Sequence, residues 1–193
     1  METTKEHVRT NQPTATDFER WIDDARGGAG RGFTALYEWL SPEVKEFAVG
    51  RAARDADAAT NDAFVACFSR IGTFQGDARA FRAWVFTAVR NRLIDQHRME
   101  QRRPPVVGDE LPVEDRSPSA EDLAMAGLAD GRTTALLAEL TDAQQEVLLL
   151  RVVSELSLEE TAEVVGRPVT AVKRLQARAL ERLRRKLSEE EVS

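Results

Sequence analysis

The feature that most constrains this chain is a set of helix signals near its carboxyl end. Ser157 is followed three residues later by Glu160, a capping box that predicts a helix beginning at Leu158. Gly166 can adopt the left-handed conformation that ends many helices, and Pro168 favours the first turn of a second helix, where its missing N–H is not needed. Two helices joined by so short a turn predict a helix-turn-helix, a unit that places its second helix in a DNA major groove.

The second helix of this pair has a basic outer face. Val172 and Leu175 are expected to pack into the corner between the two helices, beside the small Ala162. From Arg167 to Lys186 there are eight Lys or Arg residues and one Glu, the pattern expected for phosphate contact. A solvated amphipathic helix pair is the alternative, but the capping, turn and spacing signals agree with one another. The outer face consists of Thr170, Lys173, Arg174 and Arg178.

The total charge is misleading because the charges are segregated along the chain. The 193 residues have a formal net charge of −6, which by itself argues against a nucleic-acid partner. Residues 104–131, however, contain seven acidic residues, one basic residue and four prolines, whereas the stretch after Gly166 is strongly basic. We interpret residues 104–131 as a flexible acidic linker, since the segment has few large apolar residues.

Cysteine usage and hydropathy indicate a cytoplasmic protein. The single cysteine, Cys67, excludes an internal disulfide framework and fits a reducing cytosol. It lies with Phe64, Val65 and Phe68 on the expected buried side of a helix, which favours a small core residue over a redox-sensing thiol. No apolar run approaches the roughly 20 residues of a membrane span, and the polar amino terminus does not resemble a secretory signal. We therefore expect no membrane association.

Apolar spacing predicts an all-α protein of two small helical domains, because no stretch alternates with the period of a strand. The expected helices cover residues 17–25, 33–48 with an interruption or kink at Ser41–Pro42, 56–71, 80–102, 133–140 and 142–153, followed by the helix-turn-helix. The expected organisation is a disordered tail (1–16), a first domain (17–103), the linker (104–131), a second domain (132–187) and a frayed tail (188–193).

The helix over residues 80–102 has a second candidate surface for nucleic acid. Residues spaced alternately by four and three lie on one helix face. An aromatic ring followed by Asn and Arg suits nucleic acid, because bases stack on rings and phosphates pair with arginine. Alternatively, Trp84 belongs to the core, and Asp95 with Arg98 is an ordinary surface pair; this segment alone leaves both interpretations open. The face consists of Trp84, Ala88, Asn91, Asp95, Arg98 and Arg102.

Two helical domains with basic surfaces, joined by an acidic linker, resemble the extracytoplasmic-function (ECF) sigma factors of bacterial RNA polymerase. The resemblance covers about residues 32–187 and is most specific in FRAWVFTAVRNRLIDQHR (81–98) and LTDAQQEVLLLRVVSELSLEETAEVVGRPVTAVKRLQARALERLR (140–184). It implies a sigma region 2 bundle that binds core polymerase and captures the unwound −10 element. It also implies a sigma region 4 helix-turn-helix that recognises the −35 element as duplex.

The resemblance also implies individual site residues. The −10 recognition and melting segment would contain Phe81, Trp84, Arg90, Asn91, Asp95 and Arg98. The loop from Thr73 to Arg79 would hold a flipped base; extruding a base costs about a few kcal/mol, which a fitted pocket and stacking offset. Arg and Lys on the −35 helix suit guanine edges or phosphates. That helix would contribute Thr170, Lys173, Arg174, Gln176 and Arg178.

Binding to polymerase is implied by a less typical segment. ECF proteins carry a stretch resembling EDLVQEVF, and here residues 57–64 read DAATNDAF, which retains Asp62 and Phe64 but lacks one acidic and two large apolar residues. The implied contacts to core are Asn61, Asp62 and Phe64. The implied partners are the beta-prime clamp and beta flap of core polymerase, promoter DNA and an anti-sigma protein.

The sequence contains no recognisable catalytic machinery. It has no Gly-rich phosphate loop, no His/Cys cluster with metal-ligand spacing and no nucleophile motif. We therefore expect a promoter-specificity subunit without catalysis, cofactor or metal. The alternative is a stand-alone helix-turn-helix repressor or activator, which would bind duplex DNA tightly without polymerase.

Overall fold

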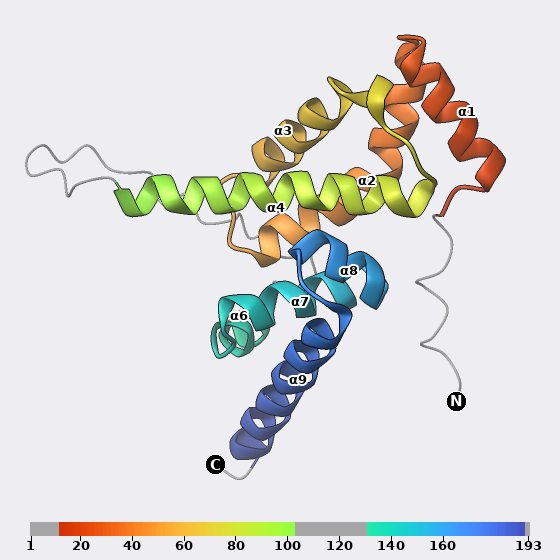
Figure 1. The fold of residues 1–193 in the computed structure, drawn as a ribbon. Coiled ribbons are helices and arrows are strands. Elements are labelled where there is room, and N and C mark those ends of the chain that lie inside the picture. Colours follow the sequence, from red (N-terminus) through yellow and green to blue (C-terminus); the bar gives the residue numbers. More distant parts are fainter. Residues whose placement is uncertain (1–11, 103–130, 192–193) are drawn as a thin grey trace, which may run out of the picture.

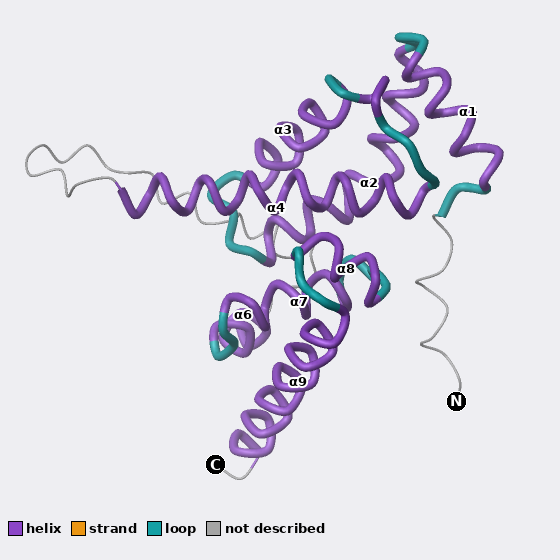
Figure 2. Tube along the Cα trace, viewed as in Figure 1, coloured by secondary structure: helices purple, strands orange, loops and turns teal. Residues whose placement is uncertain are grey.

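A computed structural model of the chain describes residues 12–102 and 131–191 (Figure 1). Most of the predicted tail (1–16) and nearly all of the predicted linker (104–131) lie outside the described residues. The described residues form α-helices and one short 3-10 helix, with no strand among them (Figure 2). The all-α prediction is thereby confirmed.

The amino-terminal domain is a bundle in which α2 and α3 pack against the long helix α4, while α1 packs on α2 (Figure 1). Local capping explains where two of these helices begin. The Thr14 hydroxyl accepts a hydrogen bond from the N–H of Asp17, and the Asp55 carboxylate accepts one from the N–H of Ala58. The elements are α1 (Ala15–Arg26), α2 (Gly30–Gly50), α3 (Ala56–Phe68), η1 (Ile71–Thr73) and α4 (Ala78–Arg102).

We predicted an interruption or a kink at Ser41–Pro42; the interruption is wrong, because α2 runs unbroken through Pro42. A proline inside a helix costs about 3 kcal/mol through a lost hydrogen bond and a steric clash. Burial on both sides of Pro42 offsets this penalty, since both halves of α2 pack into the same core. The side chains that do so, all fully buried, are Leu36, Leu40, Val44 and Phe47.

Cys67 lies in the core of this domain, as predicted. It is 1% exposed, and burial raises the pKa of its thiol to about 12. The thiolate is the reactive form of cysteine, so this side chain is a packing residue rather than a redox sensor. Val65, by contrast, was expected on the buried side of α3 and is 66% exposed.

The carboxyl-terminal domain contains the predicted helix-turn-helix. The Ser157 hydroxyl accepts a hydrogen bond from the N–H of Glu160, whose carboxylate accepts one from the N–H of Ser157, so the capping box is confirmed. Gly166 ends α8 with φ 64° and ψ 38°, in the left-handed region. The following helix continues into the 188–193 segment that we predicted to fray. The elements are α6 (Gly131–Ala138), α7 (Asp142–Val152), α8 (Leu158–Val165) and α9 (Val169–Glu191).

The two domains pack directly against each other, which the sequence did not predict. Helix α8 lies against α4, and α7 contacts α2 (Figure 1). Buried side chains of both domains belong to one continuous hydrophobic cluster. Helix α9 projects away from this junction (Figure 1), so its outer face is left open while α8 is covered.

Because α1 and α2 approach closely at Gly32, we predict that a larger side chain there lowers stability. A Cβ at Gly32 would lie 2.5 Å from the Ala25 nitrogen and 2.6 Å from the Trp21 carbonyl oxygen. Both are backbone atoms, so Gly32→Ala must push α1 away from α2. We expect the free energy of unfolding to fall by about 1–3 kcal/mol in urea titrations. Gly30→Ala is the matched control, since a Cβ there meets nothing within 4 Å; equal losses in both variants would contradict the packing.

Candidate nucleic-acid interfaces

The outer face of α9 presents most of the predicted −35 residues to solvent. Thr170, Lys173, Arg174 and Arg178 are exposed, whereas Val172 is fully buried against the rest of the domain. Gln176 differs from the others because it is half-buried and its side-chain oxygen accepts a hydrogen bond from Arg151 Nε at 3.4 Å. Gln176 is therefore oriented at least partly by its own domain.

The basic residues of α9 divide into two groups. Arg182 and Lys186 turn toward Glu139, which follows α6, with nitrogen–oxygen distances of 3.3 and 3.6 Å. Such exposed ion pairs contribute little stability, but they direct these two cations toward the protein. Lys173 and Arg174, one to two turns into the helix, face outward. The first turns of α9 therefore present basic side chains that face away from the protein.

The predicted stripe on α4 lines a groove against α3. The groove has a volume of about 410 Å³. Trp84 is half-buried and stacks on Phe74, with 5.2 Å between ring centroids and 14° between ring planes. Phe74 belongs to the predicted base-holding loop, so this stack anchors the loop beside the groove. The stripe residues that line the groove are Trp84, Ala88, Asn91 and Asp95, which confirms that they share one face.

Two predicted contact residues need correction because they are buried. Phe81 is 0% exposed and packs among Phe18, Trp39 and Phe74. Phe64 is 2% exposed and packs on other rings. Neither side chain can touch DNA or polymerase in this fold. These two aromatic residues serve core packing. The spacing of aromatic residues in a sequence does not distinguish a ring that packs in the core from a ring that contacts a partner.

The other predicted polymerase contacts lie on the exposed side of α3 and have partners within the domain. Asn61 accepts a hydrogen bond from the Tyr37 hydroxyl at 2.8 Å. Asp62 pairs with Arg92 of α4 at 2.8 Å, so it links the two walls of the groove. Val65 lies next to them on the exposed side of α3. The sequence analysis missed it as a surface residue, because its side chain is apolar and was assigned to the core.

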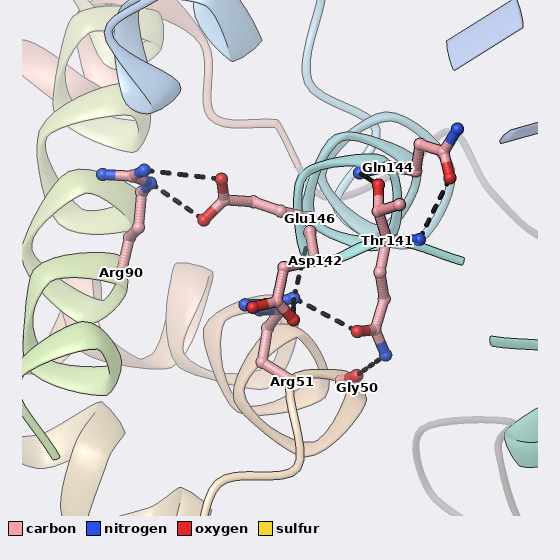
Figure 3. Close-up of polar contacts among 8 residues, drawn as sticks. Gly50, Arg51, Arg90, Thr141, Asp142, Gln144 and Glu146 are labelled. Carbon is pink, nitrogen blue, oxygen red and sulfur yellow. Dashed lines mark hydrogen bonds and ion pairs between the residues drawn. The ribbon is translucent and has the colours of Figure 1, made fainter. Parts of the chain in front are cut away.

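Arg90 and Arg98 lie apart from the groove. Arg90 donates two hydrogen bonds to the Glu146 carboxylate of α7, Nε to Oε1 at 2.9 Å and Nη2 to Oε2 at 3.4 Å (Figure 3). Arg98 is exposed, 3.7 Å from Asp95, and lines a cleft of about 590 Å³ between the domains. The structure thus brings together Trp84, Asn91 and Asp95 but turns Arg90 toward the second domain.

Burial raises the pKa of two neighbouring carboxyl groups of α2, those of Glu43 and Glu46. Burial raises the pKa of Glu43, and the charge of Arg82 opposes part of that shift. Arg82 Nη2 donates to Glu43 Oε2 at 2.6 Å. Neither residue was singled out from sequence, because partners 39 positions apart leave no local pattern.

Two further features were looked for among the described residues, a metal-binding cluster and a membrane-spanning helix. Among them, no cluster of three or more His, Cys, Asp or Glu side chains is placed to hold a metal ion. No helix in the described ranges is long and apolar enough to cross a membrane.

Known families match both domains. The family model of Sigma-70 region 2 matches residues 36–103, and that of Sigma-70, region 4 matches residues 131–183. Two helical domains with these regions in this order define a sigma factor of the sigma-70 class. The match to region 4 includes the helix-turn-helix, and the match to region 2 includes α4.

Comparison with individual relatives shows to which group of sigma factors the chain belongs. The chain is 32% identical over 172 residues to the ECF RNA polymerase sigma factor BldN of Streptomyces coelicolor, which covers 88% of this chain and 65% of that protein. It is 34% identical over 171 residues to the ECF RNA polymerase sigma factor SigD of Mycobacterium tuberculosis, covering 84% and 80%. The chain belongs to the ECF sigma factors. It spans slightly less than two thirds of BldN.

A solved structure shows the same fold. The structure of CnrH in complex with the cytosolic domain of CnrY matches with a TM-score of 0.65 and 25% identity, over 88% of this chain and 96% of that chain. A likeness over so much of both chains includes both helical domains.

The burial of Phe81 leads to a prediction that distinguishes a role in core packing from a role in DNA contact. Phe81→Ala removes a fully buried ring, so we expect the free energy of unfolding to fall by about 3–5 kcal/mol in denaturant titrations. Phe33→Ala, which truncates a half-buried ring of α2, should lose clearly less. A Phe81→Ala protein as stable as wild type but unable to melt promoters would restore Phe81 as a DNA contact.

Proposed function

We propose that this chain is the promoter-specificity subunit of a bacterial RNA polymerase and initiates transcription from its own set of promoters. The observation that carries the proposal is the pair of surfaces described above. An exposed basic face on α9 and a groove containing an aromatic residue on α4 belong to the two sigma regions that the family models match. A repressor or activator needs only the first of these surfaces and is not favoured.

The −35 element would be bound by the outer face of α9. Lys173 and Arg174 would contact guanine edges or phosphates, with Thr170 and Arg178 beside them, and the exposure of all four supports this assignment. Gln176 would contribute from a half-buried position. The −10 element would lie along the α4 groove. There Trp84 and Asn91 are placed for an unstacked base, and the stacked Phe74 supports the loop that would hold it.

The partners follow from the same assignment. Asn61 and Asp62 would contact the polymerase clamp, and their exposure on α3 supports this assignment. CnrH was solved with the cytosolic domain of CnrY, and RpoE of Bartonella quintana with the anti-sigma factor NepR, which supports an anti-sigma partner for this chain as well. We propose that the chain performs no catalysis and acts in the cytoplasm, with domain boundaries at residues 17–103 and 132–187.

Reconstitution tests the function directly. The full chain is combined with bacterial core RNA polymerase and genomic DNA from the same source, and the 5′ ends of the transcripts are sequenced. We expect new transcription starts that share upstream motifs at two separated positions. Tight duplex binding by the chain alone, with no new starts upon addition of core, would support the repressor instead.

The −35 assignment predicts the effect of a double substitution. Lys173→Ala with Arg174→Ala removes two exposed cations, each contact being worth about 1–3 kcal/mol. Promoter-directed transcription should fall at least tenfold, while core binding in pull-down assays is retained. Arg184→Ala with Arg185→Ala removes the same charge from a later turn of α9 and should have a much smaller effect. Similar losses in both double variants would indicate non-specific electrostatics.

The −10 assignment predicts a defect in promoter melting. Trp84→Ala removes the ring on the groove wall, so we expect fewer unpaired thymines by permanganate footprinting with little change in binding to duplex promoter. Trp21→Ala is the control, because Trp21 is also half-buried and packs on another indole, with ring centroids 6.3 Å apart. Equal loss of melting and duplex binding, together with reduced thermal stability, would favour a core role for Trp84.

A further inference from the structure

The loop that precedes α4 is held at Phe74 by helix α1. Arg26, the last residue of α1, donates a hydrogen bond from Nη2 to the Phe74 carbonyl oxygen at 2.6 Å. Phe18 of the same helix packs edge to face on the Phe74 ring, with 6.4 Å between centroids. One helix therefore fixes both the backbone and the side chain of Phe74. Helix α1 lies outside residues 36–103, which the Sigma-70 region 2 model matches.

The far end of the same loop is fixed by the first turn of α4. The Asp77 carboxylate accepts a hydrogen bond from the N–H of Ala80 at 3.0 Å, in the manner of an N-cap residue. Gly76 has a φ of +142°, and a Cβ there would lie 2.6 Å from the Ala80 Cβ, so the close approach of the loop to α4 requires glycine. Only Gln75 and Gly76 lie between Phe74 and Asp77, and both are exposed. The Gln75 side chain is thus presented from a short span that is tied at both ends.

Phe74 connects this span to the α4 groove. Besides stacking on Trp84, its ring packs edge to face on Phe81, with 5.5 Å between centroids. Phe74 is itself 8% exposed, so it cannot touch a base, but its backbone sets where Gln75 begins. Groups that recognise a ligand need to be held within about 0.5 Å of their working positions. A shift of Phe74 would therefore displace the loop relative to the groove wall.

Arg26 is suited to holding a backbone oxygen in place. A hydrogen bond from a charged donor is roughly twice as strong as one between neutral groups. The other terminal nitrogen of the guanidinium, Nη1, lies 3.3 Å from Asp23 Oδ1 on α1. Because the guanidinium is planar and its donors have fixed directions, contact with Asp23 on one side sets the direction from which the group meets the Phe74 carbonyl on the other.

We propose that Arg26 is a positioning residue of the −10 site. Through the Phe74 carbonyl it holds the loop in the shape that recognises an unpaired base, although it belongs to α1 and touches no base itself. The effect on transcription rests on the proposed function. The restraint of the loop does not, because it is defined by contacts within the chain.

Hydrogen exchange on the free full-length chain tests the restraint. Arg26→Ala removes the donor, so we expect amide exchange in peptides covering residues 72–78 to become about tenfold faster, while exchange in residues 169–191 is unchanged. Arg20→Ala is the matched control, because Arg20 is also on α1 and pairs with Asp17 of the same helix at 2.7 Å. Unchanged exchange in Arg26→Ala, or equal acceleration in both variants, would overturn the proposal.

Base preference in transcription tests the role of the loop. Core polymerase with each variant receives a promoter found by the reconstitution above, with every base pair of the −10 element randomised, and the transcripts are counted by template sequence. We expect Arg26→Ala to reduce the preference for one base at a single position about fivefold to tenfold. Preferences at the −35 element should be retained. Gly76→Ala deforms the loop directly and should relax the same position, whereas Arg20→Ala should relax none.

Relaxation at one position separates a positioning role from other roles. A loss of equal size at every position, with a weaker dependence on salt, would make Arg26 a phosphate contact and overturn the proposal. Relaxation in Gly76→Ala alone, or in neither variant, would overturn it as well. No transcripts from wild type with core polymerase would instead count against the proposed function, and the exchange rates of the free chain would still decide whether Arg26 restrains the loop.

Discussion

The amino-terminal half of α4 is apolar around most of its circumference, and the rest of the chain is arranged to bury it. Its fully buried side chains include Phe81, Val85, Phe86 and Val89. A helix that is apolar on nearly all sides has to be covered on nearly all sides. Helices α2 and α3 cover part of it, and α8 of the second domain covers another part. The contact between domains is thus a consequence of how apolar this half of α4 is.

Features set by neighbouring residues could be predicted from the sequence, and features set by distant contacts could not. Capping boxes and the left-handed glycine are local features, so the starts of α7 and α8 and the end of α8 were predictable residue by residue. Pro42 was misjudged because its penalty is local while the packing that offsets it comes from residues distant in sequence. Interdomain pairs were not predictable, since 27 basic and 33 acidic residues allow far too many pairings for charge alone to select Arg90 with Glu146.

The candidate site was predictable where exposure follows from helix periodicity. The outer face of α9 follows from the positions of its apolar residues, and the α4 stripe follows from spacing by three and four. Aromatic residues were harder to place, because a ring that stacks on a base and a ring that fills a core produce the same apolar signal. Phe81 and Trp84 are neighbours in one motif, yet Phe81 is enclosed by four other rings, that of Trp84 among them, while Trp84 is only half covered.

The packing of the two domains leaves the two candidate surfaces, the outer face of α9 and the α4 groove, unequally exposed. The basic face of α9 is exposed whether or not the domains are packed, so Lys173 and Arg174 are available for weak, salt-dependent binding to any duplex. Two linked sites give high affinity only when geometry lets both bind at once. In the structure Arg90 is turned toward Glu146 of the second domain rather than toward solvent. We therefore expect selective promoter binding to need both candidate surfaces, because the charge of α9 alone does not distinguish one sequence from another.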